Sequence, residues 1–139
     1  PSASIFPVTP GYNIYLIRQY RYLLGRDTLE AVAGMVEKGE SPLTCAKREL
    51  KEEAGIIAGQ WELLMQVDGS GSTTFVPGNL FLARDLEVTR AKNDASEVIE
   101  VVKMPFTKAV EKIFTGEITT SSTIIGIMML DKLRREKKI

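Results

Sequence analysis

Three glutamates, Glu49, Glu52 and Glu53, are the residues whose types and spacing point most directly to chemistry. If residues 43–54 form a helix with about 100° between successive side chains, these carboxylates fall within one arc roughly 100° wide. We call them the helix glutamates. Beside them runs an apolar stripe made of Leu43, Ala46, Leu50 and Ala54. The pattern predicts a helix that is anchored to a core by one face and presents carboxylates on the next.

Carboxylates so close together repel one another, by roughly a few tenths of a kcal/mol per pair on an exposed helix. A shared cation removes that cost, and hard carboxylate oxygens suit Mg2+ or Mn2+. The alternative is a solvated acidic face, which is the more common meaning of an isolated E-x-x-E-E on a helix. The residues that surround the helix glutamates favour the metal site.

Those surroundings form the pattern G-x5-E-x7-R-E-U-x-E-E-x-G-U, in which U is aliphatic, from Gly34 to Ile56. We call this segment the box. Besides the helix glutamates, its fixed letters are Gly34, Glu40, Arg48 and Gly55. Gly34 would let the backbone approach a metal. Arg48 lies one turn before Glu52, where it can orient that carboxylate and reduce the repulsion.

The boundaries of the predicted helix are marked independently of the glutamates. Ser41 is a good N-cap, and Pro42 suits the first helical position. Gly55 can take the left-handed conformation that ends a helix. A helix over residues 42–54 is therefore expected.

Interleaved strands and helices are expected along the rest of the chain. Apolar runs bounded by Pro, Gly and Asn predict strands at residues 3–8, 13–18, 61–67, 79–85 and 97–103, with a short one at 29–33. Further helices are expected at 107–115, with Thr107 as cap and Gly116 as stop, and from Ser121 or Ser122 to about residue 136. This order predicts an α/β layered domain with a mixed sheet.

Composition narrows the classes of function. The 139 residues suit a single domain over 1–139, and the 18 basic residues equal the 18 acidic ones. This balance argues against a broad nucleic-acid-binding surface. One cysteine and no histidine exclude an internal disulfide, a His-based zinc site and a His-dependent nucleophile. The most apolar stretch, 124–130, is too short to span a bilayer, so we expect a cytoplasmic protein without a membrane partner.

The box resembles the signature of the Nudix hydrolase superfamily. Its surroundings are similar to the branch that includes ADP-ribose and other nucleoside-diphosphate-sugar pyrophosphatases. The segments that carry this second resemblance are 16–21 (LIRQYR), 29–34 (LEAVAG), 94–101, 113–118 and 123–124. Together they cover most of the chain.

The resemblance implies an α/β/α sandwich with a central mixed β-sheet, and hydrolysis of a small molecule in which a nucleoside diphosphate is joined to another group. It implies Mg2+, with Mn2+ as a substitute. The implied metal ligands are Glu49, Glu52, Glu53 and the carbonyl of Ala33. The implied substrate-binding residues are Arg18, Arg21, Glu30 and Gly34. Glu97 matches the general base of the branch, Glu52 and Glu53 are its alternatives, and Arg48 supports catalysis.

Three questions stay open at the level of sequence. ADP-ribose or a nucleotide sugar is the expected substrate, and nucleoside triphosphates, dinucleoside polyphosphates or capped RNA are alternatives. A non-catalytic nucleotide-binding module is a different class of function, but such modules often lack box glutamates that this chain retains. A homodimer is expected, through either the apolar stripe of the last helix or an exposed sheet edge.

Overall fold

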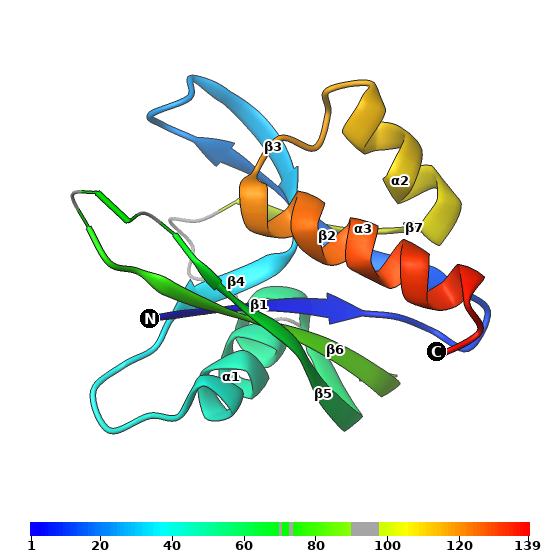
Figure 1. Cartoon of the computed structure of the whole chain (residues 1–139), viewed down its shortest axis with the longest axis horizontal. Coiled ribbons are helices and arrows are strands. Elements are labelled where there is room, and N and C mark those ends of the chain that lie inside the picture. Colours follow the sequence, from blue (N-terminus) through cyan, green and yellow to red (C-terminus); the bar gives the residue numbers. More distant parts are fainter. Residues whose placement is uncertain (70, 73, 90–97) are drawn as a thin grey trace.

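The computed structural model describes residues 1–69, 71–72, 74–89 and 98–139. Its strands and helices follow one another as shown in Figure 1. In chain order they are β1 (Ser2–Pro7), β2 (Asn13–Arg21), β3 (Arg26–Glu30), β4 (Val32–Met35), α1 (Pro42–Ala54), β5 (Ile56–Asp68), β6 (Pro77–Val88), β7 (Ile99–Pro105), α2 (Phe106–Phe114) and α3 (Ser121–Arg135).

The strands divide between two sheets. One has the order β4-β1-β6-β5, and it is mixed because β1 runs parallel to β6 but antiparallel to β4. The other is antiparallel with the order β3-β2-β7. The predicted mixed sheet is confirmed, and the second sheet is an addition to it. The chain passes from one sheet to the other at Ala31, which lies between the last residue of β3 and the first of β4.

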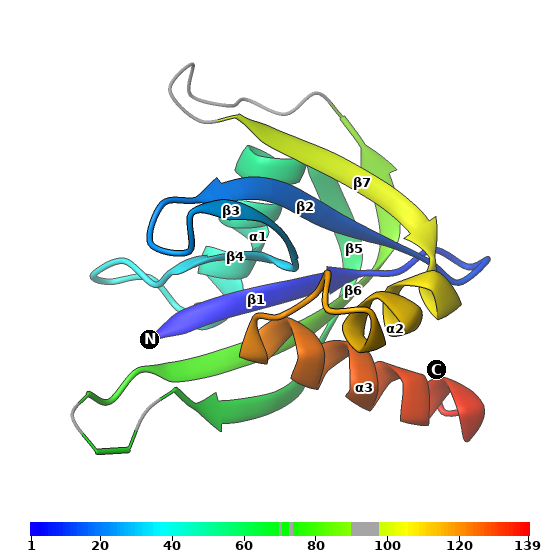
Figure 2. The same ribbon diagram turned by 90° about the horizontal axis from the view of Figure 1, so that it is seen from above.

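Helices cover both faces of the mixed sheet, as Figures 1 and 2 show. Successive side chains of a strand point to opposite faces, so β1 contributes to two separate cores. Ile5 packs in the core beneath α1 together with Leu50. Phe6 packs in the core beneath α3 together with Ile127. The resulting α/β/α layering confirms the expected fold class.

The packing of α3 on β1 is very close at one point. A Cβ atom placed on Gly126 would lie 2.0 Å from Cζ of Phe6. No side chain larger than hydrogen fits there without displacing the buried ring. Gly126 therefore sets the distance between α3 and the mixed sheet.

Several predicted boundaries differ from the structure. β5 begins at Ile56, five residues before the predicted position 61, because Ile56 pairs with Val88 as soon as Gly55 ends α1. Helix α2 begins directly after β7, so Pro105 stands at the N-cap position and the expected cap at Thr107 is wrong. The start of α3 at Ser121 is as predicted. The predicted strand start at 97 lies outside the described residues, and β7 begins at Ile99.

Candidate active site

Helix α1 forms where its sequence predicts because both ends carry strong local signals. The Oγ of Ser41 accepts a hydrogen bond from the backbone N–H of Thr44 at 3.1 Å. Pro42 occupies the first turn, where its missing N–H is not needed. Gly55 closes the helix with a φ of +65°. These caps fix where α1 begins and ends, and the burial of Ala46, Leu50 and Ala54 turns the helix glutamates away from the core.

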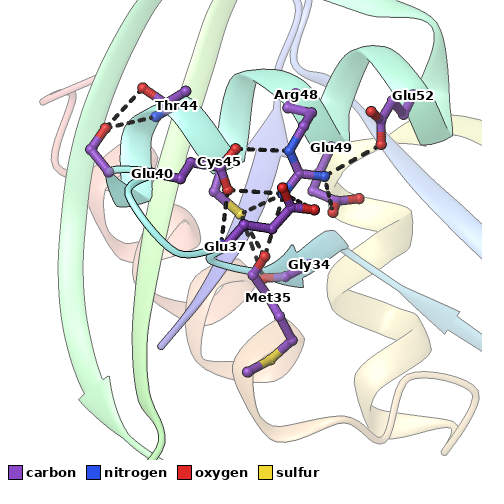
Figure 3. A network of polar contacts seen from close by, with 10 residues as sticks. Gly34, Met35, Glu37, Glu40, Thr44, Cys45, Arg48, Glu49 and Glu52 are labelled. Carbon is purple, nitrogen blue, oxygen red and sulfur yellow. Dashed lines mark hydrogen bonds and ion pairs between the residues drawn. The ribbon is translucent and has the colours of Figure 1, made fainter.

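Arg48 lies at the centre of a network of carboxylates beside α1, shown in Figure 3. Its Nε and Nη2 donate hydrogen bonds to the two carboxylate oxygens of Glu40 at 2.8 and 2.9 Å. Its Nη1 donates to Oε1 of Glu49 at 2.8 Å and to Oε2 of Glu52 at 3.4 Å. The contact expected between Arg48 and Glu52 is present, and the contact to Glu49 is shorter. Arg48 therefore holds two of the three helix glutamates.

The partner that Arg48 binds with two short hydrogen bonds is Glu40, a fixed residue of the box to which the sequence alone assigns no role. A backbone N–H bond from Glu37 adds to this clamp at 3.1 Å. The pKa of Glu40 is lowered to about 2, first because Arg48 hydrogen-bonds its carboxylate and next because of the bond from Glu37. Two parallel hydrogen bonds fix the plane of the guanidinium as well as its position. The signal that pointed to Glu40 was its fixed place in the box.

Gly34 lies directly against Glu49. A Cβ atom at position 34 would stand 2.2 Å from Cδ and Oε1 of Glu49, so β4 can approach α1 this closely only with glycine there. Desolvation by burial raises the pKa of Glu49, and hydrogen bonding and charge from Arg48 oppose that rise. From the sequence, Gly34 is expected to let the backbone approach a metal and to bind substrate. In the structure, the side chain nearest to Gly34 is that of Glu49, which the resemblance implies as a metal ligand.

The helix glutamates differ in their surroundings. The side chain of Glu49 is 14% exposed and that of Glu52 is 54% exposed. Glu53 is half-buried, and its Oε2 is shielded from solvent. Within the described part of the chain, no three acidic or cysteine side chains already converge on one cation-sized point. The helix glutamates nevertheless fit a hard divalent cation, because such cations bind carboxylate and carbonyl oxygens. Gly34 lets the backbone of β4 come close to Glu49, so that both kinds of oxygen lie near each other.

Cys45 is a buried filler of the α1 interface, as the sequence predicts. Its thiol is fully buried and lies 3.4 Å from the carbonyl oxygen of Met35. Burial raises the pKa of the thiol to about 11, and the nearby charge of Glu40 adds to the rise. Cys45 is therefore an inert thiol at neutral pH.

A second arginine–glutamate pair lies on the β2–β3 hairpin. Nε and Nη2 of Arg21 donate to the two carboxylate oxygens of Glu30 at 2.7 and 3.0 Å. Thr28 also donates a hydrogen bond to Glu30. Glu30 is buried, whereas the side chain of Arg21 is 45% exposed. Arg21 and Glu30, two of the expected substrate-binding residues, are thus brought together.

Arg18 lies on the other face of β2. Arg21 and the core residue Ile17 share a face because they are four residues apart, and Ile17 packs in the core beneath α1. Arg18 has the opposite orientation and lies 3.9 Å from Glu100. Its charge also acts on Glu117, whose pKa lies below its usual range chiefly because Lys112 donates a hydrogen bond to its carboxylate. The structure therefore does not bring Arg18 together with the box.

The two remaining expected residues are Ala33 and Glu97. Ala33 is half-buried on β4, next to Gly34 in the chain and paired with Ser4 of β1. Glu97 lies outside the described residues. Ala33 is thus close to Glu49 through its neighbour Gly34.

Comparison with known proteins identifies the family of the chain. Residues 1–121 match the family model of the NUDIX domain. The chain therefore belongs to the Nudix family. Within the chain, the box is the segment that brings together α1, Arg48 and the helix glutamates.

Two curated relatives resemble the chain over most of its length. An ADP-ribose pyrophosphatase of Mycobacterium tuberculosis (strain ATCC 25618 / H37Rv) is 33% identical over 130 residues, covering 91% of this chain and 63% of the relative. A GDP-mannose pyrophosphatase of Yersinia enterocolitica is 33% identical over 127 residues, covering 84% of this chain and 65% of the relative. The chain spans less than two thirds of the length of either relative.

A solved structure described as an ADP compounds hydrolase superposes with a TM-score of 0.85. The superposition covers 99% of this chain and 76% of that one, at 21% sequence identity. At this identity the likeness supports the fold alone. Among the described residues, no helix combines the length and the apolar character needed to cross a bilayer.

Proposed function

We propose that this protein is a divalent-metal-dependent pyrophosphatase that cleaves the diphosphate of a nucleoside diphosphate linked to a sugar. The products are a nucleoside monophosphate and a phosphorylated sugar. The observation that carries the proposal is the Arg48 network, which holds Glu49 against Gly34 and orients Glu52 beside it. The names of the relatives favour ADP-ribose or a nucleotide sugar such as GDP-mannose as substrate.

The proposed cation is Mg2+, with Mn2+ as a substitute. Glu49, Glu52, Glu53 and the carbonyl of Ala33 would hold it, because these are hard oxygen donors on facing segments of α1 and β4. When bound, such a cation offsets diphosphate charge and lowers the pKa of the attacking water. Arg48 keeps Glu49 and Glu52 in place for this role by hydrogen bonds of 2.8 and 3.4 Å.

Arg21 is the proposed phosphate contact. The Nε and Nη2 atoms of Arg21 donate hydrogen bonds to Glu30, which fixes the plane of the guanidinium. Much of the Arg21 side chain stays exposed. Arg18 was also expected to bind substrate, but its position on the opposite face of β2 favours Arg21 as the phosphate contact.

Glu97 is the proposed general base, with Glu52 and Glu53 as alternatives. Replacing Glu97 with Gln removes the proton acceptor but keeps the shape of the side chain. We expect kcat to fall about 10- to 1000-fold with metal binding nearly unchanged, in line with the usual effect of losing a general base. A near-wild-type kcat would move the role to Glu52 or Glu53.

The proposal has three further parts. Residues 1–139 act as one Nudix domain, because α3 contributes Ile127 and Leu130 to the core that it shares with β1 and β6. The protein is a homodimer, which light scattering after size-exclusion chromatography would test. It works in the cytoplasm, and its single free cysteine is in keeping with a reducing compartment.

A substrate screen tests the central proposal. ADP-ribose, nucleotide sugars, dinucleoside polyphosphates and nucleoside triphosphates are incubated with Mg2+, and nucleoside monophosphate or other products are measured. The Glu53→Gln variant is the control that keeps size and loses charge. Activity on ADP-ribose or a nucleotide sugar that disappears in the control supports the proposal. Turnover of only the triphosphates or dinucleoside polyphosphates would redefine the substrate, and binding without turnover would indicate a nucleotide-binding module.

A further inference from the structure

Helix α3 contacts the chain at Ala31, where it passes from β3 in one sheet to β4 in the other. We call this point the crossing. Ala31 belongs to neither sheet ladder, since the pairing of β3 ends at Glu30 and that of β4 begins at Val32. Its N–H instead donates a hydrogen bond to Oγ1 of Thr123, 92 residues further along the chain, at 3.0 Å. Ala31 is 3% exposed and Thr123 is 2% exposed. The bond therefore satisfies a backbone donor that water does not reach.

The residues at the start of α3 reinforce this bond. Thr120 stands at the N-cap position but makes no side-chain cap bond to the helix. Its hydroxyl donates instead to Oγ1 of Thr123 at 2.8 Å. Thr119 accepts a hydrogen bond from Nη2 of Arg26, the first residue of β3, at 3.1 Å. Residues 119–123, at and just before the start of α3, thus contact the first residue of β3 and the residue that follows its last. Figure 1 shows α3 beginning next to the point where β3 leads into β4.

The crossing carries active-site groups on both sides. Glu30, which grips Arg21, immediately precedes Ala31. Ala33 and Gly34 follow two and three residues later, and Gly34 lies against Glu49. Among the described residues, β4 is an edge strand whose ladder partner is β1, so its sheet fixes it on one side only. A shift of the backbone at Ala31 would be passed to Glu30 and to Ala33 together.

We infer that Thr123 is a positioning residue for the proposed active site, because its hydroxyl fixes the backbone at Ala31. Through Ala31 it sets where the Arg21–Glu30 pair stands relative to the β4 backbone beside Glu49. This inference rests on the proposed function. Thr123 acts through the backbone at Ala31. Among the hydrogen bonds described, it makes none to the helix glutamates.

The test compares three variants by Mn2+ affinity, measured by calorimetry or electron paramagnetic resonance, and by kcat/KM. Thr123→Val keeps the shape and loses the hydroxyl, Thr123→Ser keeps the hydroxyl, and Ile127→Val loosens the core under the same helix. We expect Thr123→Val to weaken Mn2+ binding by about tenfold and to lower kcat/KM by about 10- to 100-fold, the usual scale for groups that orient metal ligands. Thr123→Ser should stay within about threefold of wild type by the same measures.

Ile127→Val separates positioning from general stability. It should lower the melting temperature without changing Mn2+ affinity. If Thr123→Val changes Mn2+ affinity and kcat/KM no more than Ile127→Val does at a similar loss of melting temperature, Thr123 is only a packing residue and the inference is wrong.

Amide exchange of the wild-type protein provides a test that needs no variant. The Ala31 N–H should exchange as slowly as the ladder amides of β2, because it is buried and bonded to Thr123. Fast exchange at Ala31 would overturn the inference even if Thr123→Val failed to fold. If wild type hydrolyses nothing, the proposed function fails, while the exchange rate and the Mn2+ affinities still decide the role of Thr123.

Discussion

Two arginine–glutamate pairs of nearly the same geometry stand in this molecule in different surroundings. Arg48 and Glu40 are joined by hydrogen bonds of 2.8 and 2.9 Å, and Arg21 and Glu30 by bonds of 2.7 and 3.0 Å. In both pairs the glutamate is well shielded, with 11% and 9% of the side chain exposed. The arginines differ, since the side chain of Arg48 is 25% exposed and that of Arg21 is 45% exposed.

The difference teaches how one interaction serves two purposes. Arg48 also bonds to Glu49 and Glu52, so its charge is used inside the protein to hold carboxylates together. Arg21 is oriented by its glutamate but remains nearer to solvent, where an anionic ligand can reach it. The first pair should therefore govern the metal site, and the second should govern substrate affinity.

The largest expected effect comes from removing a carboxylate that Arg48 holds. Glu49→Gln keeps the size of the side chain but removes the charge that the proposed cation needs. We expect kcat/KM to fall about 1000-fold, because several kcal/mol of stabilisation are lost at about 1.4 kcal/mol per factor of ten. Hydrolysis assays across a range of Mg2+ concentrations measure this. Glu62→Gln, an exposed change on β5, is the matched control, and equal activity of the two variants would contradict the assignment.

Arg48→Lys should have the next largest effect. Lysine keeps the positive charge but lacks the planar fork that binds both oxygens of Glu40 while reaching Glu49. We expect kcat/KM to fall about 10- to 100-fold, with more Mg2+ needed for half-maximal activity. A variant with a normal Mg2+ requirement would show that charge alone, and not the fork, holds the carboxylates.

Arg21→Lys should act on substrate affinity. Loss of a charge-assisted hydrogen bond, worth roughly 1.5 kcal/mol, would raise KM about tenfold. The kcat value and the Mg2+ requirement should stay close to those of wild type. Steady-state kinetics at saturating Mg2+ distinguish this pattern from that of Arg48→Lys. If both lysine variants raise the Mg2+ requirement, the proposed division of labour between the two pairs is wrong.

The smallest effect is expected in acid stability. The pKa of Glu40 lies at about 2 in the folded protein and near 4.5 when unperturbed, so its contribution to stability is complete above about pH 4.5. That contribution is lost as the pH falls from 4.5 through 2. The difference in melting temperature between wild type and Glu40→Gln should therefore be constant above pH 5 and shrink toward pH 2. A difference that grows on acidification would contradict this assignment.

The parts of the fold that could be predicted from sequence are those controlled by local signals. Helix α1 has a cap at each end and a clear apolar stripe, and its predicted bounds are correct. The Arg48–Glu40 clamp was missed because it depends on how residues 36–41 fold back onto the helix. The bond between Ala31 and Thr123 joins segments 92 residues apart, and no local pattern marks it.

The predicted strand at 13–18 stops three residues before Arg21, whereas β2 continues to Arg21. Side chains alternate along a strand, so Arg18 and Arg21, three residues apart, must point to opposite faces. The resemblance suggested both residues for the substrate, whereas alternation allows only one of them to face the side of the box. The passage from one sheet to the other at Ala31 could not be foreseen in the same way, because a single residue separates β3 from β4.

The position of β1 has a consequence for the order of folding. β1 is synthesised well before β6, yet it lies inside the mixed sheet, between β4 and the parallel strand β6. The β6 residues that pair with it are Gly78 to Ala83, more than 70 positions later. Such distant pairing carries a large loop-closure cost and slows folding. During synthesis the backbone N–H and C=O groups along that edge of β1 lack their strand partner until β6 has left the ribosome.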